Sequence, residues 1–175
     1  LVAALLKRLS MYKLRARVSL SQDMALGVLA LWDGAVSDGL DYDDPRHAGL
    51  GRRALLPREA AAQAATALPA DYEAHRILCG VPRGGVDFAW GDVFPHDASM
   101  DLIHGVDFKK GCYVGQELTA RMHYRGLGKK HLYTIEGSNL PPPGTEITED
   151  GKTIGEMRSS IGHTGLALLK DEAIG

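Results

Sequence analysis

Residues 109–121 read KKGCYVGQELTAR and place a thiol, two glycines, an amide, a carboxylate and three cations within thirteen positions. No other window of the chain carries as much chemistry. Gly111 and Gly115 can adopt positive φ and let another group approach the backbone, so Cys112 is expected on a turn. The two preceding lysines favour its thiolate form. The pattern predicts a reactive or sensing cysteine, and the alternative is a small buried hydrophobe, since cysteine is often buried.

The run from Lys110 to Glu117, followed by Arg121, resembles the signature of the YgfZ family of folate-binding proteins, relatives of the glycine-cleavage T-protein, an aminomethyltransferase. That signature reads K-G-C-Y/F-x-G-Q-E-x-x-x-R, and this chain fills all eight fixed positions. The similarity extends upstream through residues 72–76 (YEAHR) and 95–101 (PHDASMD), and downstream into a β-rich tail.

The resemblance implies an α+β fold in two parts. Residues 1–125 would form an aminomethyltransferase-like folate-binding domain whose N-terminal part is missing. Residues 126–175 would form a small C-terminal β-barrel, truncated at its end. The basic, glycine-bearing hinge of residues 125–130 marks the expected start of the second unit.

The hydrophobic pattern predicts the individual elements. Apolar residues recur every four positions at the start of the chain, which indicates a helix that packs on a sheet. Asp150-Gly151 is a two-residue hairpin signal, because both residues tolerate the positive φ of a type I′ turn. Asp71 can cap a helix that follows Pro69, and Pro69 itself is expected to end the helix before it. The remaining predictions are strands at 14–20, 25–32, 54–56, 131–136, 145–149, 152–157 and 166–169, helices at 57–68 and 72–79, and a loop at 36–51.

Composition excludes several classes of protein. The 175 residues are 45% hydrophobic and 24% charged, an ordinary globular balance that can build one core or two small ones. A formal charge of −2 lacks the basic surplus typical of nucleic-acid binding. An RNA-binding module built on Arg121, Arg125, Lys129 and Lys130 would also need stacking platforms, and aromatic residues make up only 6% of the chain. Direct nucleic-acid binding is therefore not expected.

Cysteine and histidine usage argues against a structural metal site. Cys79 and Cys112 are too few for a four-thiolate site, and the chain has no C-x-x-C. His96, His104 and His123 have no spacing that specifies a metal site, so we expect none. So few cysteines favour a reducing compartment, and we expect a cytoplasmic protein without a disulfide framework. The apolar opening stretch is far shorter than the roughly 20 residues of a membrane span, so no membrane association is expected.

The resemblance further implies a ligand and its contacts. Tetrahydrofolate or another reduced folate would be the cofactor, held in a cleft lined by the helix around residue 73. Asp97 stands where the family has a glutamate that accepts hydrogen bonds from the pterin. From spacing alone, the helix carries only an ordinary surface ion pair worth well under ~1 kcal/mol. The candidate cofactor-binding residues are Glu73, Arg76, Asp97, Lys110, Gln116, Glu117 and Arg121, and the candidate catalytic residue is Cys112.

The function implied by the resemblance is that of a tetrahydrofolate-binding accessory protein in iron-sulfur cluster assembly or repair. It would support cluster-dependent tRNA-modifying enzymes, with Cys112 as its working group, and its partners would be folate and iron-sulfur proteins or their assembly machinery. The alternative is an enzyme, a folate-dependent aminomethyltransferase or demethylase of the T-protein type. The T-protein relatives do not use the thiol of this signature, which favours the accessory role. Their catalytic aspartate lies in an N-terminal part absent from this sequence, so turnover stays open.

Overall fold

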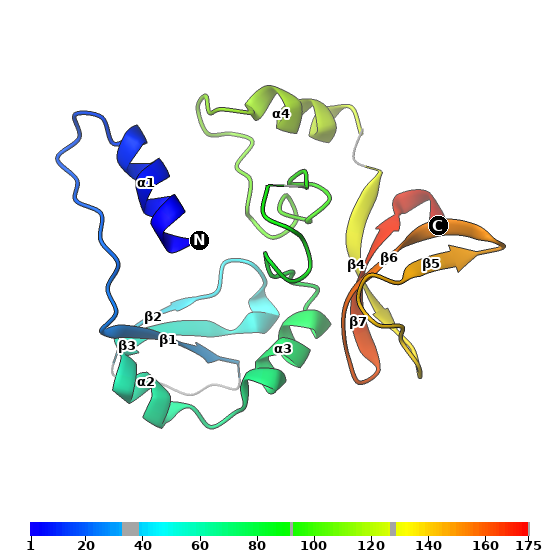
Figure 1. The fold of residues 1–175 in the computed structure, drawn as a ribbon, viewed down its shortest axis with the longest axis horizontal. Coiled ribbons are helices and arrows are strands. Elements are labelled where there is room, and N and C mark those ends of the chain that lie inside the picture. The colour runs from blue at the N-terminus through cyan, green and yellow to red at the C-terminus, as the bar shows by residue number, and fades with distance from the viewer. Residues whose placement is uncertain (33–38, 92, 127–128, 175) are drawn as a thin grey trace.

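The computed structural model describes residues 1–32, 39–91, 93–126 and 129–174 (Figure 1). Two antiparallel sheets lie on either side of the helix α3 (Pro69–Leu78), which contacts β6 (Lys152–Ile161) and β7 (Thr164–Lys170) of the second sheet. Residues 79–115 contain no helix or strand among those that the structure describes, and they lead into α4 (Gln116–Tyr124). The architecture is therefore mixed α and β with separate antiparallel sheets.

The first sheet has the strand order β1-β3-β2. Leu31, Ala54, Leu56 and Ala61 form its small core, with Ala61 contributed by α2. Gly27 allows this packing, since a Cβ there would lie 3.1 Å from that of Ala61. The bounds are β1 (Leu26–Leu31), β2 (Leu40–Asp43), η1 (Ala48–Leu50), β3 (Arg52–Pro57) and α2 (Arg58–Ala64).

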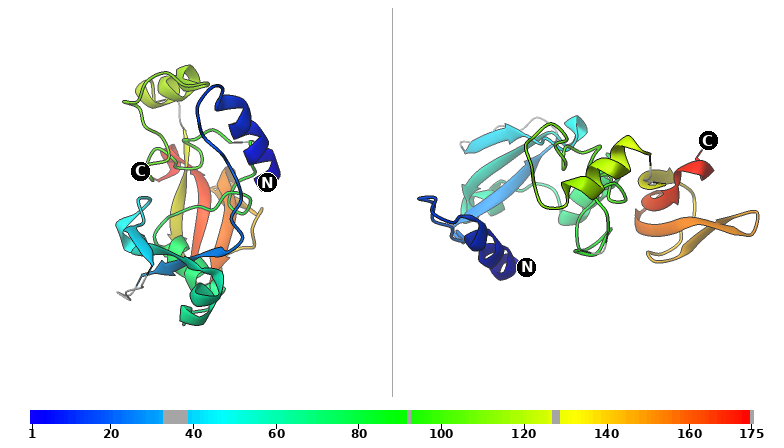
Figure 2. Two further views of the ribbon diagram at one scale, coloured as in Figure 1. Left: turned by 90° about the vertical axis from the view of Figure 1, so that its left-hand side faces the viewer. Right: turned by 90° about the horizontal axis from the view of Figure 1, so that it is seen from above.

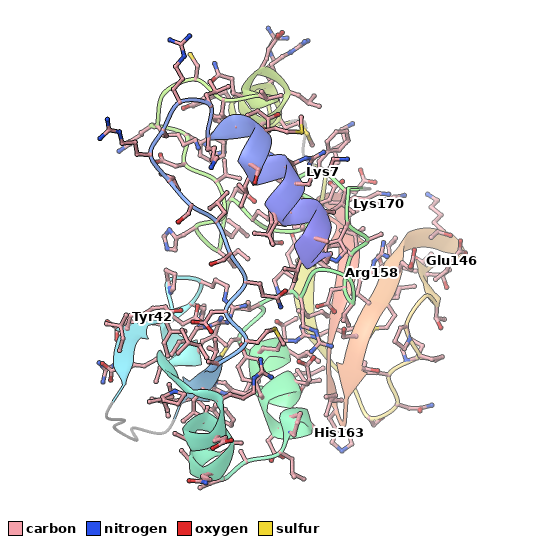
Figure 3. The ribbon with its side chains drawn as sticks, turned by 60° about the vertical axis from the view of Figure 1, so that its left-hand side comes forward. Lys7, Tyr42, Glu146, Arg158, His163 and Lys170 are labelled. Carbon is pink, nitrogen blue, oxygen red and sulfur yellow. The ribbon has the colours of Figure 1, made fainter. Side chains whose placement is uncertain are left out.

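The structure confirms the strands predicted at 25–32 and 54–56 and corrects the loop predicted at 36–51. Residues 33–38 lie outside the described part of the chain, but residues 40–43 form the edge strand β2. Its sequence, LDYD, has two aspartates, which are depleted in strands. Pairing with β3 and the ion pair between Arg52 Nη1 and Asp41 Oδ2 (2.8 Å) hold it in the sheet. Tyr42 projects from this edge (Figure 3).

The N-terminal segment differs from its prediction. The helix α1 (Val2–Tyr12) forms as expected, yet none of its residues is buried and Leu5 stays 51% exposed, so the prediction that it packs on a sheet is wrong. The predicted strand at 14–20 is also wrong. An alternating pattern becomes a strand only when a neighbouring strand supplies hydrogen bonds, and residues 13–25 instead run along the outside of the molecule to β1 (Figures 1 and 2).

Proline and glycine set the ends of α3. Pro69 stands at the first helical position, where its missing N–H costs nothing, so it begins α3 instead of merely ending the helix before it. The preceding helix, α2, already ends at Ala64. The helix was predicted to begin at residue 72 with Asp71 as its cap, but its N-cap is Leu68. Asp71 is the third helical residue, and its Oδ2 accepts a hydrogen bond from the Leu68 backbone N–H (2.7 Å). Gly80 follows the helix with φ +69°.

The second sheet has the order β4-β7-β6-β5. Asp150 (φ 49°) and Gly151 (φ 76°) both have positive φ between β5 and β6, which confirms the hairpin. Met157, Ala167 and Leu169 form the core of this sheet. Its elements are β4 (Lys130–Glu136), β5 (Glu146–Glu149), β6, β7 and the short η2 (Asp171–Ala173).

The predicted boundary near residue 125 falls between Tyr124 at the end of α4 and Lys130 at the start of β4. The two parts are joined by hydrogen bonds, including one from the Leu132 N–H to Ser99 Oγ (3.1 Å). The division into domains and the folate-binding nature of the first part stay predictions. Among the described residues, no helix combines the length and the apolar character that crossing a membrane requires.

Candidate functional site

Cys112 is exposed and lies two residues before the turn at Val114 and Gly115 that leads into α4, and not on the turn itself as predicted. Gly115 is the residue that caps the helix, and its φ of 88° is left-handed, as predicted for a glycine here. Gly111 is not among the glycines with positive φ. The side chain of Gln116 closes the turn, because its Oε1 accepts a hydrogen bond from the Tyr113 N–H (2.9 Å). The local sequence therefore holds the thiol outward instead of burying it.

The turn and the first part of α4 line a shallow depression of about 740 Å³. Cys112, Gln116, Glu117 and Arg121 share its wall, so four of the predicted site residues do meet. Arg121 Nη1 lies 3.7 Å from Glu117 Oε1, and both side chains are largely exposed. All of the lining comes from one continuous stretch, which makes the depression an open surface feature. Such a surface suits contact with another macromolecule better than enclosure of a small molecule.

Lys110 is placed beside this surface. Its Nζ lies 5.0 Å from the centre of the Tyr113 ring, within the range of a cation–π contact. The preceding turn is organised by Asp107, whose Oδ1 accepts hydrogen bonds from the N–H groups of Lys109 (2.8 Å) and Lys110 (3.2 Å). The signature residues thus form one surface cluster around the N-terminal end of α4.

Glu73 and Arg76 lie elsewhere, on α3, in a buried ion network. The Arg76 side chain is 1% exposed, and its guanidinium binds Glu73 Oε2 (Nη2, 2.7 Å) and Asp87 Oδ2 (Nη1, 2.8 Å). Arg83 Nη1 also binds Glu73 (2.5 Å). The expectation of an ordinary surface ion pair is wrong, because sequence spacing shows the neighbours on the helix and not the loop that covers them.

This network also joins the two parts of the fold. Asp87 has a fully buried side chain, and it accepts hydrogen bonds from the Arg83 N–H (2.6 Å) and from Ser159 Oγ on β6. The Arg76 Nη1 group adds a bond to the Val81 carbonyl (3.1 Å). Arg76 and Glu73 therefore satisfy one another and their neighbours, and their visible role is to fasten α3 to the second sheet.

Asp97, the predicted pterin acceptor, is half-buried in the turn-rich segment 95–104. The predicted cofactor-binding residues consequently occupy three places: α3, this segment and the start of α4. They do not line one cavity among the described residues. A single folate site made of all of them therefore does not fit this structure.

A second groove, of about 600 Å³, lies beside the first sheet. Trp32 and Tyr72 are among its lining residues, with ring centres 5.9 Å apart. Arg53 also lines it and binds Asp44 Oδ2 through its Nε (2.7 Å). Burial raises the pKa of Asp44, but hydrogen bonds from Arg46 and then Arg53 outweigh that effect and hold this pKa far below its usual range. The sequence offered no signal for this groove, because its walls come from separate elements.

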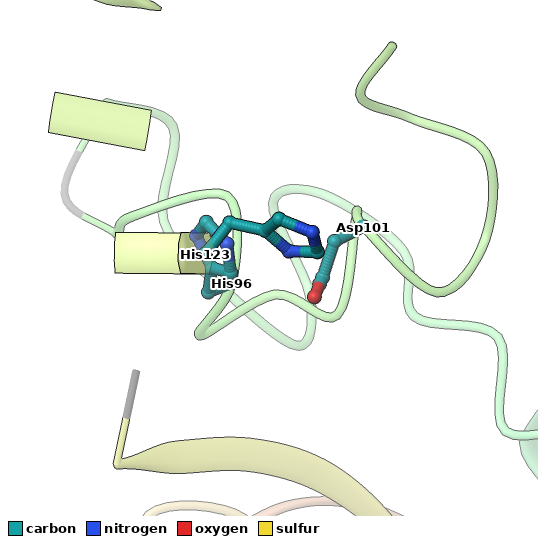
Figure 4. Close-up of side chains that lie close together, drawn as sticks. All are labelled: His96, Asp101 and His123. Atoms are coloured by element: carbon teal, nitrogen blue, oxygen red, sulfur yellow. The ribbon is translucent and has the colours of Figure 1, made fainter. Parts of the chain in front are cut away.

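The structure also brings together His96, Asp101 and His123, for which no metal-binding spacing was recognised (Figure 4). Each offers one potential ligand atom, and these atoms lie within 4.8 Å of one another. His104 is not part of the group. Two of the three come from the turn-rich segment and the third from α4, so only tertiary structure could reveal the cluster.

Known proteins resemble both the tail and the whole chain. Residues 129–175 match the family described as the CAF17 C-terminal beta-barrel domain. The iron-sulfur cluster assembly factor IBA57, mitochondrial, of Homo sapiens is 35% identical over 193 residues, covering 98% of this chain and 54% of the relative. This chain is thus similar to IBA57 proteins over almost all of its own length. The Mus musculus protein of the same name is 34% identical over 202 residues, which cover 99% of this chain and 55% of the relative. The Mycosarcoma maydis homologue is 35% identical over 208 residues, which cover 93% of this chain and 51% of the relative.

The chain spans about half the length of the IBA57 relatives it matches. These relatives fall in the wider superfamily of the T-protein and the YgfZ proteins, which confirms the resemblance at that level. Placement in the YgfZ family itself stays a prediction. The match to a β-barrel domain family agrees with the β-rich tail expected after residue 126.

The expected cytoplasmic location is wrong. The relatives are named mitochondrial, which points to mitochondria. A low cysteine count argues against an oxidising compartment but does not choose between reducing ones. Compartment addresses are carried by targeting segments and not by the composition of a folded domain.

Proposed function

We propose that this protein is an iron-sulfur cluster assembly factor that acts through the exposed thiol of Cys112. The observation that carries the proposal is the position of this thiol, held out on a glycine-capped turn in a chain homologous to IBA57 proteins. Thiolates are the usual ligands of iron-sulfur clusters, and a cluster takes four protein ligands. One exposed thiol can supply only one of them, so a partner protein must complete the coordination.

Cys79 is a poor alternative to Cys112. It is half-buried at the end of α3, and burial raises the pKa of its thiol, which disfavours the thiolate. Its Sγ lies 3.9 Å from His75 Nε2. The Cys79 thiol is thus packed within the fold and is less available to a partner, so Cys79 serves as a matched control for Cys112.

The surroundings of Cys112 suit a protein partner. Val114 is 87% exposed and Leu118 50% exposed, and both lie in the same depression as the thiol. Arg121 also lines this depression, and Lys110 lies next to it, over the ring of Tyr113. Apolar side chains next to unburied cations favour a partner that presents an apolar contact with acidic groups around it.

The test compares two cysteine substitutions in the full-length protein. In a strain lacking the endogenous protein, Cys112→Ala should fail to restore the activity of an iron-sulfur enzyme, whereas Cys79→Ala should restore it. Immunoblots confirm equal amounts of both variants. Restoration by Cys112→Ala at the wild-type level would contradict the proposal, because the thiol would then serve only in packing.

We further propose that the protein binds a reduced folate and that its clients include cluster-dependent tRNA-modifying enzymes. Both proposals rest on the signature resemblance. The groove beside the first sheet adds flat aromatic walls, Trp32 and Tyr72, against which a pterin ring can stack. No step of the cluster chemistry depends on folate in this proposal.

Calorimetry with tetrahydrofolate tests the ligand and locates it. If the groove holds the ring, Trp32→Ala should abolish the binding heat and Asp97→Ala should keep it. If Asp97 instead accepts hydrogen bonds from the pterin, as the resemblance implies, the two results should be reversed. Absence of binding heat in the wild-type protein would contradict the folate proposal. Loss of tRNA modification in the deletion strain, restored by the wild-type gene, checks the proposed clients.

A further inference from the structure

Three side chains at the junction of the turn-rich segment and α4 form a group unrelated to the thiol site. His96 and Asp101 come from the turn-rich segment and His123 from the last turn of α4. Their potential ligand atoms all lie within 4.8 Å of one another, and the close-up shows the three side chains close together (Figure 4).

The burial of this group points to a ligand. His96 is only 3% exposed, and neither of its ring nitrogens has a hydrogen-bond partner among the described residues. Asp101 Oδ1 is buried and unpartnered in the same way. Buried polar atoms are normally hydrogen-bonded, and each exception calls for an explanation. One nitrogen of a neutral imidazole and a carboxylate oxygen are both electron-pair donors, so a cation would satisfy Asp101 Oδ1 and one nitrogen of His96 together.

Aromatic packing holds the imidazoles in place. The ring of Phe108 stacks on His123 with centres 3.8 Å apart and an angle of 19° between the planes, and it lies 6.2 Å from the ring of His96. Tyr124 packs edge-on against His123 at 4.9 Å. Fixed ring orientations reduce the cost of assembling a coordination site. His123 is itself exposed, which leaves part of the site open to solvent.

We propose that His96, Asp101 and His123 bind one divalent transition-metal ion. Two imidazole nitrogens and one carboxylate oxygen form a donor set used for Zn²⁺ and for Fe²⁺, with the remaining positions open to water or to a ligand from another molecule. Mg²⁺ and Ca²⁺ prefer oxygen donors and fit this set poorly. Neither Cys112 nor the proposed function enters this inference.

Metal binding would also order the segment that carries Cys112. Ligands at Asp101 and His123 close a loop whose interior, residues 102–122, includes the thiol turn and most of α4. Closing a loop restricts the conformations of the chain inside it. The metal site and the thiol stand at opposite ends of α4, whose nine residues at 1.5 Å per residue span about 13 Å. An ion at one end would therefore stabilise the position of the other.

The experiment titrates chelator-treated full-length protein with Zn²⁺, and with Fe²⁺ under anaerobic conditions, against a competing indicator. One ion per chain is expected, with no response to Mg²⁺. His123→Ala and Asp101→Asn should each weaken binding at least about tenfold, since even changes next to a ligand cost 10–100-fold. The matched control is His104→Asn, because His104 is exposed with φ 59° and asparagine tolerates that backbone.

Two further measurements separate this site from the thiol and from misfolding. Cys112→Ala should bind the metal like the wild type, and circular dichroism should show unchanged folding of His123→Ala. Hydrogen exchange in residues 102–122 should slow on adding Zn²⁺ to the wild type and not to His123→Ala. Wild-type saturation only at metal far above the protein concentration would overturn the proposal. Binding by His123→Ala and Asp101→Asn within twofold of the wild type would overturn it too.

Discussion

Replacing Arg76 with alanine should destabilise the protein far more than its position on an amphipathic helix suggests. Its guanidinium binds Glu73, Asp87 and the Val81 carbonyl, and the Asp87 side chain is fully buried. Removing one partner of a buried ion pair leaves an uncompensated charge and typically costs about 3–5 kcal/mol. Folded domains are stable by only about 5–15 kcal/mol, so this loss is a large fraction of the total.

Arg121 supplies a matched control. It is also a helical arginine paired with a glutamate on its own helix, but the contact is 3.7 Å and the Arg121 side chain is 53% exposed. Exposed pairs of this kind contribute about 0.3–0.5 kcal/mol. Arg76→Met keeps most of the buried aliphatic volume, and so separates the loss of charge pairing from the loss of packing.

Urea unfolding followed by circular dichroism measures all three variants. We expect Arg76→Ala and Arg76→Met to lose about 3–5 kcal/mol of unfolding free energy, and Arg121→Ala to lose less than about 0.5 kcal/mol. An unfolding free energy of Arg76→Ala within about 1 kcal/mol of that of Arg121→Ala would contradict a stabilising role of the buried network, since the network would then contribute no more than a surface pair. If Arg76→Met kept the wild-type unfolding free energy and Arg76→Ala lost it, the loss in Arg76→Ala would come from packing and not from charge pairing.

Two other substitutions test the backbone and the electrostatics. Gly115→Ala should cost about 1–2 kcal/mol, because a Cβ is disfavoured at φ 88°, whereas Gly111→Ala, with open space around it and no positive φ, should be nearly neutral. Equal unfolding midpoints for Gly115→Ala and Gly111→Ala would contradict the left-handed backbone at Gly115. Asp44→Asn should lower stability by about 1–3 kcal/mol at neutral pH. The depressed pKa of Asp44 means that its contribution is complete above the unfolded value of about 3.9 and fades as pH falls below it, so the gap to the wild type should narrow in acid. A gap that does not change with pH would show that ionisation of Asp44 is not its source.

Features encoded by residues adjacent in the chain were predictable from the amino-acid sequence. The hairpin at Asp150 and Gly151 and the left-handed Gly115 beside Cys112 follow from φ preferences within a few residues. The strands β1, β3, β4 and β7 were equally recognisable, because their apolar patterns lie within single segments. The resemblance of residues 110–121 to a family signature indicated a role in iron-sulfur cluster assembly.

Tertiary structure alone decided whatever depends on contacts between distant segments. Pairing with β3 makes residues 40–43 a strand, whereas residues 14–20 pair with no strand among the residues that the structure describes and remain irregular. A covering loop turned the Arg76 pair into a buried network, and the turn-rich segment brought His96 to His123. The hydrophobic period of a segment shows which of its faces is apolar, but it does not show which other element packs against that face. The burial of a side chain and the geometry of a ligand site depend on that packing.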